Sequence, residues 1–480
     1  MNVRQIPSPG AFNVDPPGSS RTSAAVPEAT HQGSSLLLRL LFAIPVILLP
    51  NALHVPIGTG IPGINTSNLL FLVLVGALLI GRRETAPTLA QAGRLTPPLV
   101  GLFLALAVAF VIAQRHDMSN ALDDLTDLKN AIFYPLFYFV YRRCRQDLHG
   151  TRQLIALVLL VAAIAGLTAI FQGVQFGLGT YDSAHRATGP FGAVSKANRA
   201  GVFYAMFLPM FAAIAVLSER KKLRMAALVG CVVLAVAILF TYSRQSYLIA
   251  LVGLLILLMH RSVIAAILAA VLLLMSVNMF PESVIERVQE TRQTDARGNT
   301  AVDNSTTSRV EIWEGAIDMW RDHPAGVGLG RFQSSIGEYS RHRGRDAHNS
   351  FVLVLAEAGA LGLAAMTWLF WRLWGLSRRL RRSAAADDPE GRALALGFSV
   401  TLVSMFLGNV FGSPFFDGLV MANFWILCGL LERYGALKAQ AAMDADAAQE
   451  PSPSVTFADR FPLAARTMPG IAATPGPRSR

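Results

Sequence analysis

Long apolar stretches recur along the chain, separated by short polar connections. Twelve can be placed from Leu36 onward, near residues 36–53, 62–80, 97–114, 125–141, 153–172, 199–217, 224–242, 244–259, 263–280, 349–373, 392–412 and 417–433. Hydrophobic residues make up 53% of the 480 residues and charged residues 15%, whereas soluble proteins carry roughly a quarter charged residues. A single water-soluble core of this size is excluded because such cores stop growing at about 250–300 residues. The pattern predicts an all-α polytopic membrane protein with about 12 transmembrane helices.

Basic residues gather at the ends of the even-numbered stretches. These ends carry Arg82 and Arg83; Arg142, Arg143 and Arg145; Arg220, Lys221, Lys222 and Arg224; His260 and Arg261; Arg378, Arg379, Arg381 and Arg382; and Arg433 with Lys438. Lys and Arg in short loops are retained on the cytoplasmic side, so both termini are expected in the cytoplasm. The net charge of +11 then reflects orientation, and no nucleic-acid partner is expected.

The two ends of the chain differ in composition from its middle. Residues 1–34 are rich in Pro, Ser, Gly and Ala and show no cleavable signal peptide, and residues 436–480 are rich in Ala, Pro and Asp. Both segments are expected to be disordered cytoplasmic tails around a membrane domain at 35–435. The three cysteines, Cys144, Cys231 and Cys428, show no CxxC spacing, so neither a disulfide framework nor a zinc site is expected.

A long polar segment, 281–348, interrupts the apolar pattern and is expected to form a small outer, periplasmic domain. Ser308 and Glu311 have the spacing of a capping box. Apolar residues at helical spacing follow until Pro324, namely Trp313, Ala316, Ile317 and Trp320. The segment therefore predicts an amphipathic helix over 309–322 that could lie on the membrane surface.

Two arginines on the outer side are candidates for binding an anion. Arg244 lies in a polar break between two apolar stretches, where the charge rule disfavours a cation. Arg309 is expected in the first turn of the predicted helix, where the helix dipole would add to its charge. The alternatives are an interfacial contact of Arg244 with lipid phosphate and a solvated pair of Arg309 with a neighbouring glutamate.

Two further groups of polar residues precede apolar stretches. His348 and Asn349 follow the basic residues Arg341, Arg343 and Arg345, and a neutral imidazole there could accept a hydroxyl proton. A loop with Arg186 and Asn198 could close over a polar headgroup. The alternatives are a hydrogen-bonding anchor for His348, and turn chemistry with interfacial cations for the loop.

The remaining motifs give weaker indications of a functional site. The glycines of 326–330 lack the last glycine of a dinucleotide loop, since Arg331 stands there, and are interpreted as a turn. Glu357 is either a proton relay or a carboxyl shielded by close helix packing at Ala358 and Gly359. No metal-binding or Ser-His-Asp motif occurs on the outer side, and no metal or other cofactor is expected.

Taken together, these motifs resemble the O-antigen ligase and O-antigen polymerase superfamily over roughly residues 180–370. The similar features are Thr241 to Arg244 at the end of a span; Arg309 with Trp313; Gly326, Gly328 and Gly330 with Phe332; His348 to Phe351; Glu357 with Gly359 and Gly362; and Arg186 with Gly189 and Asn198.

The resemblance implies a GT-C-like glycosyltransferase of the bacterial inner membrane. Such proteins move a glycan from undecaprenyl diphosphate to an acceptor sugar on the periplasmic face, without a metal. The implied partners are the lipid-linked glycan, an acceptor glycan or lipid A-core, and membrane lipids. Arg244 and Arg309 would hold the donor diphosphate and His348 would position or deprotonate the acceptor hydroxyl. Arg186, Arg345, Asn349 and Asn198 are the implied substrate-binding residues.

Two alternatives to a ligase remain open at this point. A polymerase shares the motifs, since acceptor choice is not readable in the loop. A secondary transporter or flippase for an anionic substrate would also fit the number of spans and the outer arginines, although no repeated half-pattern of the kind common in transporters is visible.

Overall fold

A computed structural model describes residues 36–50, 66–80, 89, 92–116, 121–177, 182–275, 284–285, 292–294, 300–302, 304–384 and 388–449. The chain divides into two units, Met1–Gly33 and Ser34–Arg480, and every described residue belongs to the second. The predicted tail 1–34 and the part of the C-terminal tail from residue 450 lie outside the described residues.

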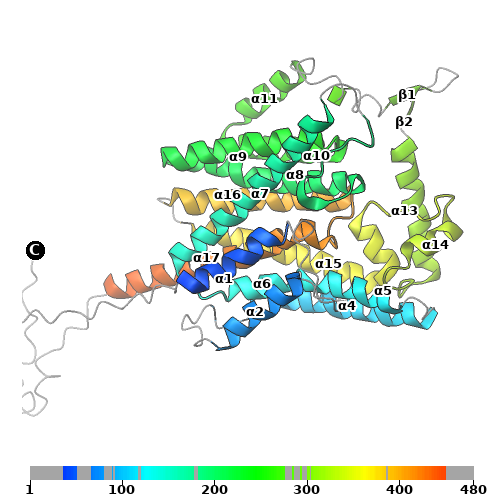
Figure 1. The fold of residues 1–480 in the computed structure, drawn as a ribbon, viewed down its shortest axis with the longest axis horizontal. Coiled ribbons are helices and arrows are strands. Elements are labelled where there is room, and N and C mark those ends of the chain that lie inside the picture. Colours follow the sequence, from blue (N-terminus) through cyan, green and yellow to red (C-terminus); the bar gives the residue numbers. More distant parts are fainter. Residues whose placement is uncertain are drawn as a thin grey trace, which may run out of the picture. The chain divides into compact units, whose positions relative to one another are not determined.

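The described residues are almost entirely helical, which confirms the predicted all-α class (Figure 1). The helices are α1 Leu36–Leu48, α2 Thr66–Ile80, α4 Thr96–His116, α5 Ala121–Phe133, α6 Leu136–Arg142, α7 Leu148–Phe176, α8 Ala197–Leu217, α9 Lys221–Phe240, α10 Arg244–Arg261, α11 Val263–Met275, α13 Asn304–Asp322, α14 Phe332–Tyr339, α15 Ser350–Ser383, α16 Pro389–Val410 and α17 Gly418–Gln449, with short 3-10 turns η1 Gly189–Phe191 and η2 Val194–Lys196. Strands β1 Arg292–Thr294 and β2 Thr300–Val302 form one antiparallel hairpin, with Gln293 opposite Ala301.

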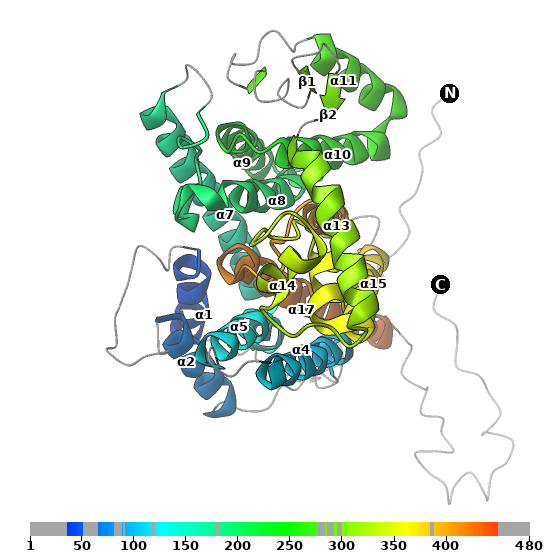
Figure 2. The ribbon, with the colours of Figure 1, turned by 90° about the vertical axis from the view of Figure 1, so that its right-hand side faces the viewer.

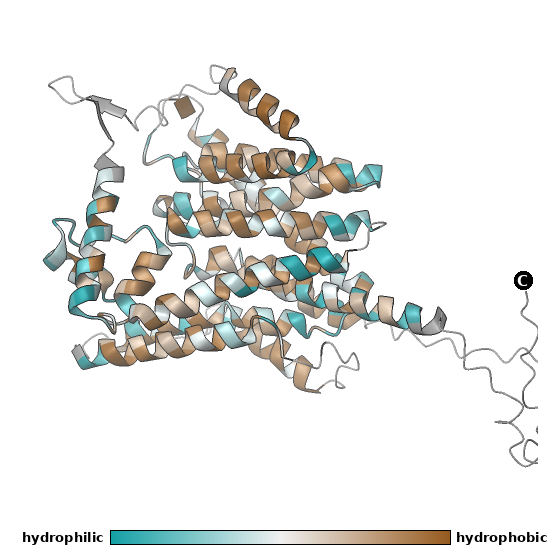
Figure 3. Cartoon of the chain, turned by 180° about the vertical axis from the view of Figure 1, so that it is seen from behind, coloured by the Kyte–Doolittle hydropathy of each residue, from teal (hydrophilic) through white to brown (hydrophobic). Residues whose placement is uncertain are grey.

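Six of the described helices are long and apolar enough to cross a membrane. They are α4, α7, α8 with η2, α9, α15 and α16, and the shorter helices α1, α2 and α11 are also apolar. Figure 3 shows brown apolar residues along most of these helices, with teal polar residues toward the ends. Length and composition thus identify a polytopic membrane protein.

Helix α8 lies at the centre of the helix bundle, packed by α9, α10 and α16. Its aromatic side chains are buried, and the ring of Phe203 lies tilted against those of Phe191 and Phe207, with 4.8 Å between ring centroids in each pair. Gly201 allows α10 to approach closely, because a Cβ there would lie 2.4 Å from the Ser246 hydroxyl. This contact fixes where α10 begins relative to α8.

The predicted fourth span, 125–141, is broken into α5 and α6. Pro135 lacks an N–H and its ring disfavours a helical conformation for the preceding Tyr134. The chain bridges the break with short-range bonds, from the Phe137 N–H to the Tyr134 carbonyl at 3.1 Å and from the Tyr138 N–H to the Pro135 carbonyl at 3.1 Å.

Helix α15 is also interrupted, at Gly359, which has the left-handed φ of 64°. The turn 326–330 supplies the hydrogen bonds that the break removes. The Val327 N–H donates to the Ala356 carbonyl at 2.9 Å, and the Gly328 N–H donates to the Glu357 carbonyl at 3.1 Å. The glycine-rich segment is therefore a turn, as interpreted, and its function is to complete the backbone of a broken helix.

Residues 312–347, in the later part of the predicted outer domain, form a small core with the start of α15. Ile312, Ala316 and Met319 of α13 are buried against Phe332 and Ile336 of α14. The side of α13 that carries Ile312, Ala316 and Met319 is thus covered by protein, whereas Ile317 is 38% exposed. Figure 2 views this end of the bundle, where α13 runs across the front with α14 and α15 beside it.

At its other end the chain is more helical than expected. Helix α17 continues to Gln449, so the start of the segment predicted as a disordered tail, 436–449, is helical. The segment is rich in Ala, and Ala is the residue with the highest helix propensity.

Candidate functional site

The loop 411–417, between α16 and α17, connects several segments at the end of the bundle where α15 begins, which we call the His348 end. The Phe411 carbonyl accepts a hydrogen bond from Nη1 of Arg309 at 3.3 Å. The Gly412 carbonyl accepts one from the Ser350 N–H at 3.1 Å. The loop therefore positions α13 and the first residue of α15 together.

Charged residues reinforce the same loop. The Ser413 hydroxyl donates a hydrogen bond to Asp346. Asp417, whose side chain is 4% exposed, accepts from Nη1 of Arg199 at 3.1 Å and lies 3.5 Å from Nζ of Lys196. Arg199 also lies 3.7 Å from Asp346, measured from Nη2 to Oδ2. These ion pairs bring the start of α8 beside the residues that precede α15.

His348 occupies the bend from which α15 starts. Its φ of 48° is left-handed, which is uncommon for a residue other than glycine. The residues on both sides are held: the Ala347 carbonyl accepts from Nε1 of Trp313 at 2.7 Å, and Asn349 caps α15. Left-handed backbone of this kind persists only where the surroundings fix it. The imidazole itself is 40% exposed, with Nδ1 4.0 Å from Oδ2 of Asp346.

Burial and the neighbouring arginines favour the neutral form of His348. Burial lowers the pKa of the imidazole; Asp346 raises the pKa, and Arg309, Arg199 and Arg345 lower it further, so that it lies below its ordinary value. Three guanidinium groups from three separate segments thus act on one imidazole. A neutral imidazole can accept a proton, and the surrounding cations can attract an anion.

Arg309 lies at the site, but the prediction that it opens the helix is wrong. Helix α13 begins at Asn304, so Arg309 is inside the helix and Ser308 with Glu311 do not form its capping box. The start was placed too late because the Ser and Thr residues of 305–308 have low intrinsic helix propensity. Glu311 instead accepts from Arg341 and from Nε2 of His342, the latter at 2.6 Å.

Arg186 and Asn198 interact with each other. Nη2 of Arg186 donates to Oδ1 of Asn198 at 2.6 Å, and Nε donates to the Thr241 carbonyl at 2.9 Å. Nη2 also lies 3.4 Å from the carbonyl of Tyr242, a second residue with a left-handed φ, of 47°. Arg186 therefore ties the loop before α8 to the bend from which α10 starts.

Arg244 is the first residue of α10 and is partly buried. Its neighbour Gln245 reaches the loop 411–417, because a Cβ built on Gly412 would lie 3.2 Å from its Nε2. The same Nε2 lies 3.5 Å from the carbonyl of Asn198. The start of α10 is thereby connected, through Gly412, to the loop that also binds Arg309.

The remaining predicted residues differ in their surroundings. Arg345 is exposed beside His348. Asn349 is buried, and its Oδ1 accepts from the N–H groups of Phe351 and Val352 at 2.9 and 3.2 Å, so its acceptor oxygen serves as a helix cap. Oε1 of Glu357 accepts from the Phe332 N–H at 3.2 Å, which ties α15 to α14.

The loop 411–417 and the carboxylates Asp346 and Asp417 were not predicted from the sequence. A signal was present, because Ser413, Pro414 and Asp417 interrupt two apolar stretches in the same way as the polar break at Arg244. Across the described residues, no three His, Cys, Asp or Glu side chains come together in a way that could hold a metal ion.

The fold and this site define a polytopic helical membrane protein with a cationic, histidine-containing site at one end of its bundle. Residues 229–367 match the family model described as O-antigen ligase, which confirms the resemblance for this segment. Members of that family are glycosyltransferase-like enzymes, and the match supports a function of the O-antigen ligase or polymerase type, with a lipid-linked glycan and an acceptor as partners. A comparison with curated proteins finds no match.

Proposed function

We propose that the protein is an O-antigen ligase of the bacterial inner membrane. It would move a glycan from undecaprenyl diphosphate to an acceptor sugar, most naturally on lipid A-core, at the periplasmic face. The observation that carries this proposal is the position of His348, a histidine of lowered pKa beside Asp346 and within the field of Arg309, Arg199 and Arg345. The family match supports the reaction type.

In the proposed reaction the acceptor hydroxyl oxygen forms a bond to the anomeric carbon of the donor glycan. The bond between that carbon and the diphosphate oxygen breaks, and its electron pair leaves with the lipid diphosphate. The hydroxyl proton passes to His348, whose Nδ1 lies toward Asp346, which leaves Nε2 to accept it. Asp346 then stabilises the imidazolium that forms.

Arginines would bind the leaving diphosphate. Negative charge grows on that group as its bond to the sugar breaks, so fixed guanidinium groups stabilise the transition state more than the bound substrate. We assign this role to Arg309, which the Phe411 carbonyl orients, and to Arg244. Arg345, Asn349, Arg186 and Asn198 are proposed substrate contacts, Arg186 and Asn198 by shaping the loop at the start of α8.

Transfer with purified protein tests the proposal. Full-length protein in detergent receives an undecaprenyl-diphosphate-linked glycan and an acceptor, with no ion gradient, so that a transporter would give no product. His348→Ala should reduce the transfer rate at least about 100-fold. Its control is His260→Ala, an exposed histidine at the far end of α10. An unchanged rate in H348A would refute the proposed role of the imidazole.

A matched pair on α13 tests the diphosphate contact. Arg309→Ala should reduce transfer about 100-fold or more, as the loss of a transition-state donor does. Arg321→Ala, an exposed arginine near the end of the same helix, should have little effect. Equal losses in the two variants would show that α13 is merely sensitive to arginine removal.

Ligase and polymerase activities differ in what accumulates in cells. Deleting the gene of a ligase leaves polymer unattached to lipid A-core, whereas deleting that of a polymerase leaves single repeats. Gel separation of the surface polysaccharide therefore distinguishes the two. Single repeats in the deletion strain would replace the ligase proposal with the polymerase.

The proposed orientation puts both termini in the cytoplasm and the His348 end in the periplasm. It rests on the basic residues at the ends of the even-numbered apolar stretches. A reporter that is active only outside the cytoplasm, fused near residue 300, should give a signal. A signal only from a cytoplasmic reporter at this position would overturn the orientation and with it the periplasmic reaction.

A further inference from the structure

A second cationic site lies at the opposite end of α15 from His348. Arg372 lies in the part of α15 that follows the break at Gly359, whereas Ser350 begins the part before it. Two cavities of about 430 and 320 Å³ adjoin there, and both are lined by Arg94 and Arg379. The described residues that line one or both also include Arg142, Arg372, Arg378, Arg382, Gly375, Leu376, Leu380, Leu431 and Glu432.

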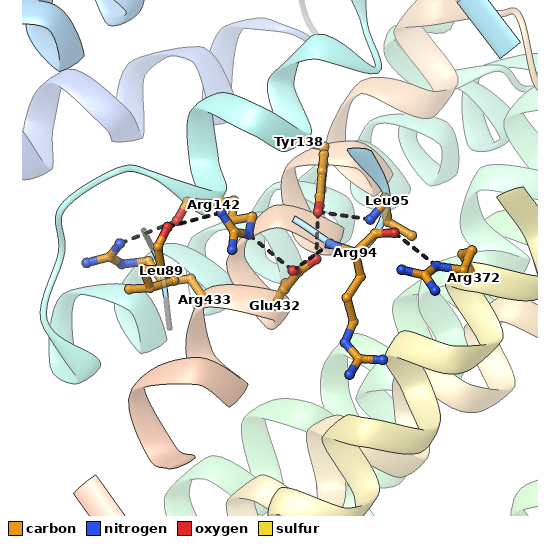
Figure 4. A network of polar contacts seen from close by, with 8 residues as sticks. All are labelled: Leu89, Arg94, Leu95, Tyr138, Arg142, Arg372, Glu432 and Arg433. Carbon is orange, nitrogen blue, oxygen red and sulfur yellow. Dashed lines mark hydrogen bonds and ion pairs between the residues drawn. The ribbon is translucent and has the colours of Figure 1, made fainter. Parts of the chain in front are cut away.

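The single carboxylate among these described lining residues, Glu432, is already engaged (Figure 4). Its Oε2 accepts from the hydroxyl of Tyr138 at 2.6 Å. Its Oε1 accepts from Nε of Arg142 at 3.1 Å and from the backbone N–H of Arg94 at 3.0 Å. The charge of Arg142 is therefore neutralised by Glu432, while Arg94 and Arg379 line both cavities.

Arg94 lies among other arginines. Its side chain extends away from Glu432, and its Nε is buried with no hydrogen-bond partner among the described residues. Burial lowers the pKa of this guanidinium, Arg379 lowers it further, Glu432 raises it, and Arg372 lowers it again. Nε of Arg372 donates to the Arg94 carbonyl at 3.1 Å, which holds the two residues side by side. Among the described residues that line the cavities, cations thus outnumber the single carboxylate, Glu432.

An apolar surface continues from the cavities along α4 and α15. Leu104 of α4 is 63% exposed, and Trp371 of α15, next to Arg372, is 69% exposed. The two helices pack together, and Gly101 lies against the ring of Trp368. Arginines beside an exposed tryptophan and aliphatic side chains match a molecule that has an anionic head and a hydrocarbon chain.

We propose that this site, at the opposite end of α15 from His348, binds the phosphate group of an anionic lipid. Arg94, Arg379 and Arg372 contact the phosphate, Arg378 and Arg382 attract it, and the acyl chains lie along α4 and α15. Basic pockets between helices bind lipid headgroups in this way, because two or more guanidinium groups can share one phosphate. Free phosphate carries the same head chemistry without the chain, so the test separates the two.

Two variants remove the site by different means. Arg379→Gln removes a charge common to both cavities. Gly375→Leu keeps every charge but fills space, because no atom lies within 4 Å of a Cβ built there. Their controls are Arg381→Gln, an exposed arginine on the same helix that lies by Trp374, and Gly76→Leu, a glycine of α2 with equally open surroundings.

Native mass spectrometry of the purified full-length protein measures retained lipid, with phosphatidylglycerol and phosphatidylcholine as probes. The unmodified protein should retain phosphatidylglycerol preferentially. R379Q should weaken that binding about tenfold, the effect of losing one charged hydrogen bond. G375L should weaken it by a similar factor because its side chain occupies the space of the headgroup, and the controls should not weaken it. Equal retention of both lipids, or variants that bind like their controls, would overturn the proposal. Phosphatidylglycerol that millimolar inorganic phosphate displaces completely, with the phosphate itself retained, would contradict a lipid ligand.

Discussion

The indole N–H of Trp313 donates a 2.7 Å hydrogen bond to the carbonyl of Ala347, the residue immediately before His348. This bond links α13 to the bend that carries the imidazole. Since His348 has a left-handed backbone, its neighbours must hold the bend in place, and Trp313 does so on one side while the Asn349 cap does so on the other.

Trp313→Phe should therefore reduce kcat for glycan transfer clearly, while it lowers the free energy of unfolding only slightly. Phenylalanine keeps an aromatic ring in the small core but leaves the Ala347 carbonyl without its donor, at a stability cost of about 1 kcal/mol. The measurements are kcat for glycan transfer and thermal unfolding in detergent. Trp320→Phe is the control and should leave kcat unchanged, because the indole N–H of this tryptophan on the same helix has no hydrogen-bond partner among the described residues. An unchanged kcat in W313F would show that the bend does not depend on this bond.

The pH dependence of transfer should report His348. Its pKa lies below the ordinary value of about 6.5, so the neutral base is already present at neutral pH and activity is lost only as pH falls through the lowered pKa. Between the lowered and the ordinary pKa the unfolded chain binds more protons than the folded one, so stability should also fall as pH decreases there. A pH–rate profile and unfolding at several pH values measure the two effects.

Asp346→Asn tests the direction in which Asp346 shifts the pKa of His348. Asp346 raises the pKa of His348, so removing its charge should move the acid limb of the pH–rate profile to lower pH. Asp318→Asn, an exposed aspartate paired with Arg321, is the control and should leave the limb in place. A shift to higher pH in D346N would contradict the proposed surroundings of the imidazole.

Asp417→Asn should destabilise the His348 end. The variant leaves Arg199 and Lys196 without the buried carboxylate that they share. Because Arg199 is partly exposed, water compensates much of the loss, and we expect about 1–2 kcal/mol rather than the larger cost of a fully buried pair. Thermal unfolding measures the loss, and a second substitution, Arg199→Gln, should add little to it. Fully additive losses would mean that the two residues do not stabilise each other.

Gly359→Ala should be more damaging than a glycine replacement in an ordinary helix. The left-handed φ of 64° disfavours a side chain, and a Cβ would lie 2.5 Å from the Pro324 carbonyl oxygen. We expect a loss of about 1–3 kcal/mol. Gly76→Ala, with an open position in α2, should gain up to about 1 kcal/mol. Equal unfolding temperatures in the two variants would show that the break in α15 is not required.

Sequence patterns predicted the helices well because each apolar span can be recognised from its own residues alone. They also indicated His348, Arg309 and the turn 326–330 one by one, whereas a shared site for His348 and Arg309 was implied only by the resemblance to the family. They failed where distant segments decide the outcome. Arg142 and Arg433 were interpreted as loop cations, yet both are buried, and Nε of Arg433 donates to the Gln146 carbonyl at 2.9 Å.

The site itself was only partly predictable. The family match ends at residue 367, whereas Asp417 and the loop 411–417 lie beyond it and Arg199 lies before it. Nothing local to His348 indicates that a serine and an aspartate more than fifty residues later in the chain will orient its surroundings. Such contacts follow from the packing of α8, α15 and α16, which the apolar pattern does not specify.

Because α15 is interrupted at Gly359, the residues on its two sides do not share one helical phase. An extra residue between Ser350 and Ala358 would rotate the start of the helix by about 100° relative to the rest of α15 and carry the Ser350 N–H, with His348 before it, away from the Gly412 carbonyl. An extra residue after Gly359 would turn only the remainder, including Arg372, and leave His348 where it is. Insertions and deletions after Gly359 should therefore leave the reaction at His348 intact, whereas those between Ser350 and Gly359 should impair it.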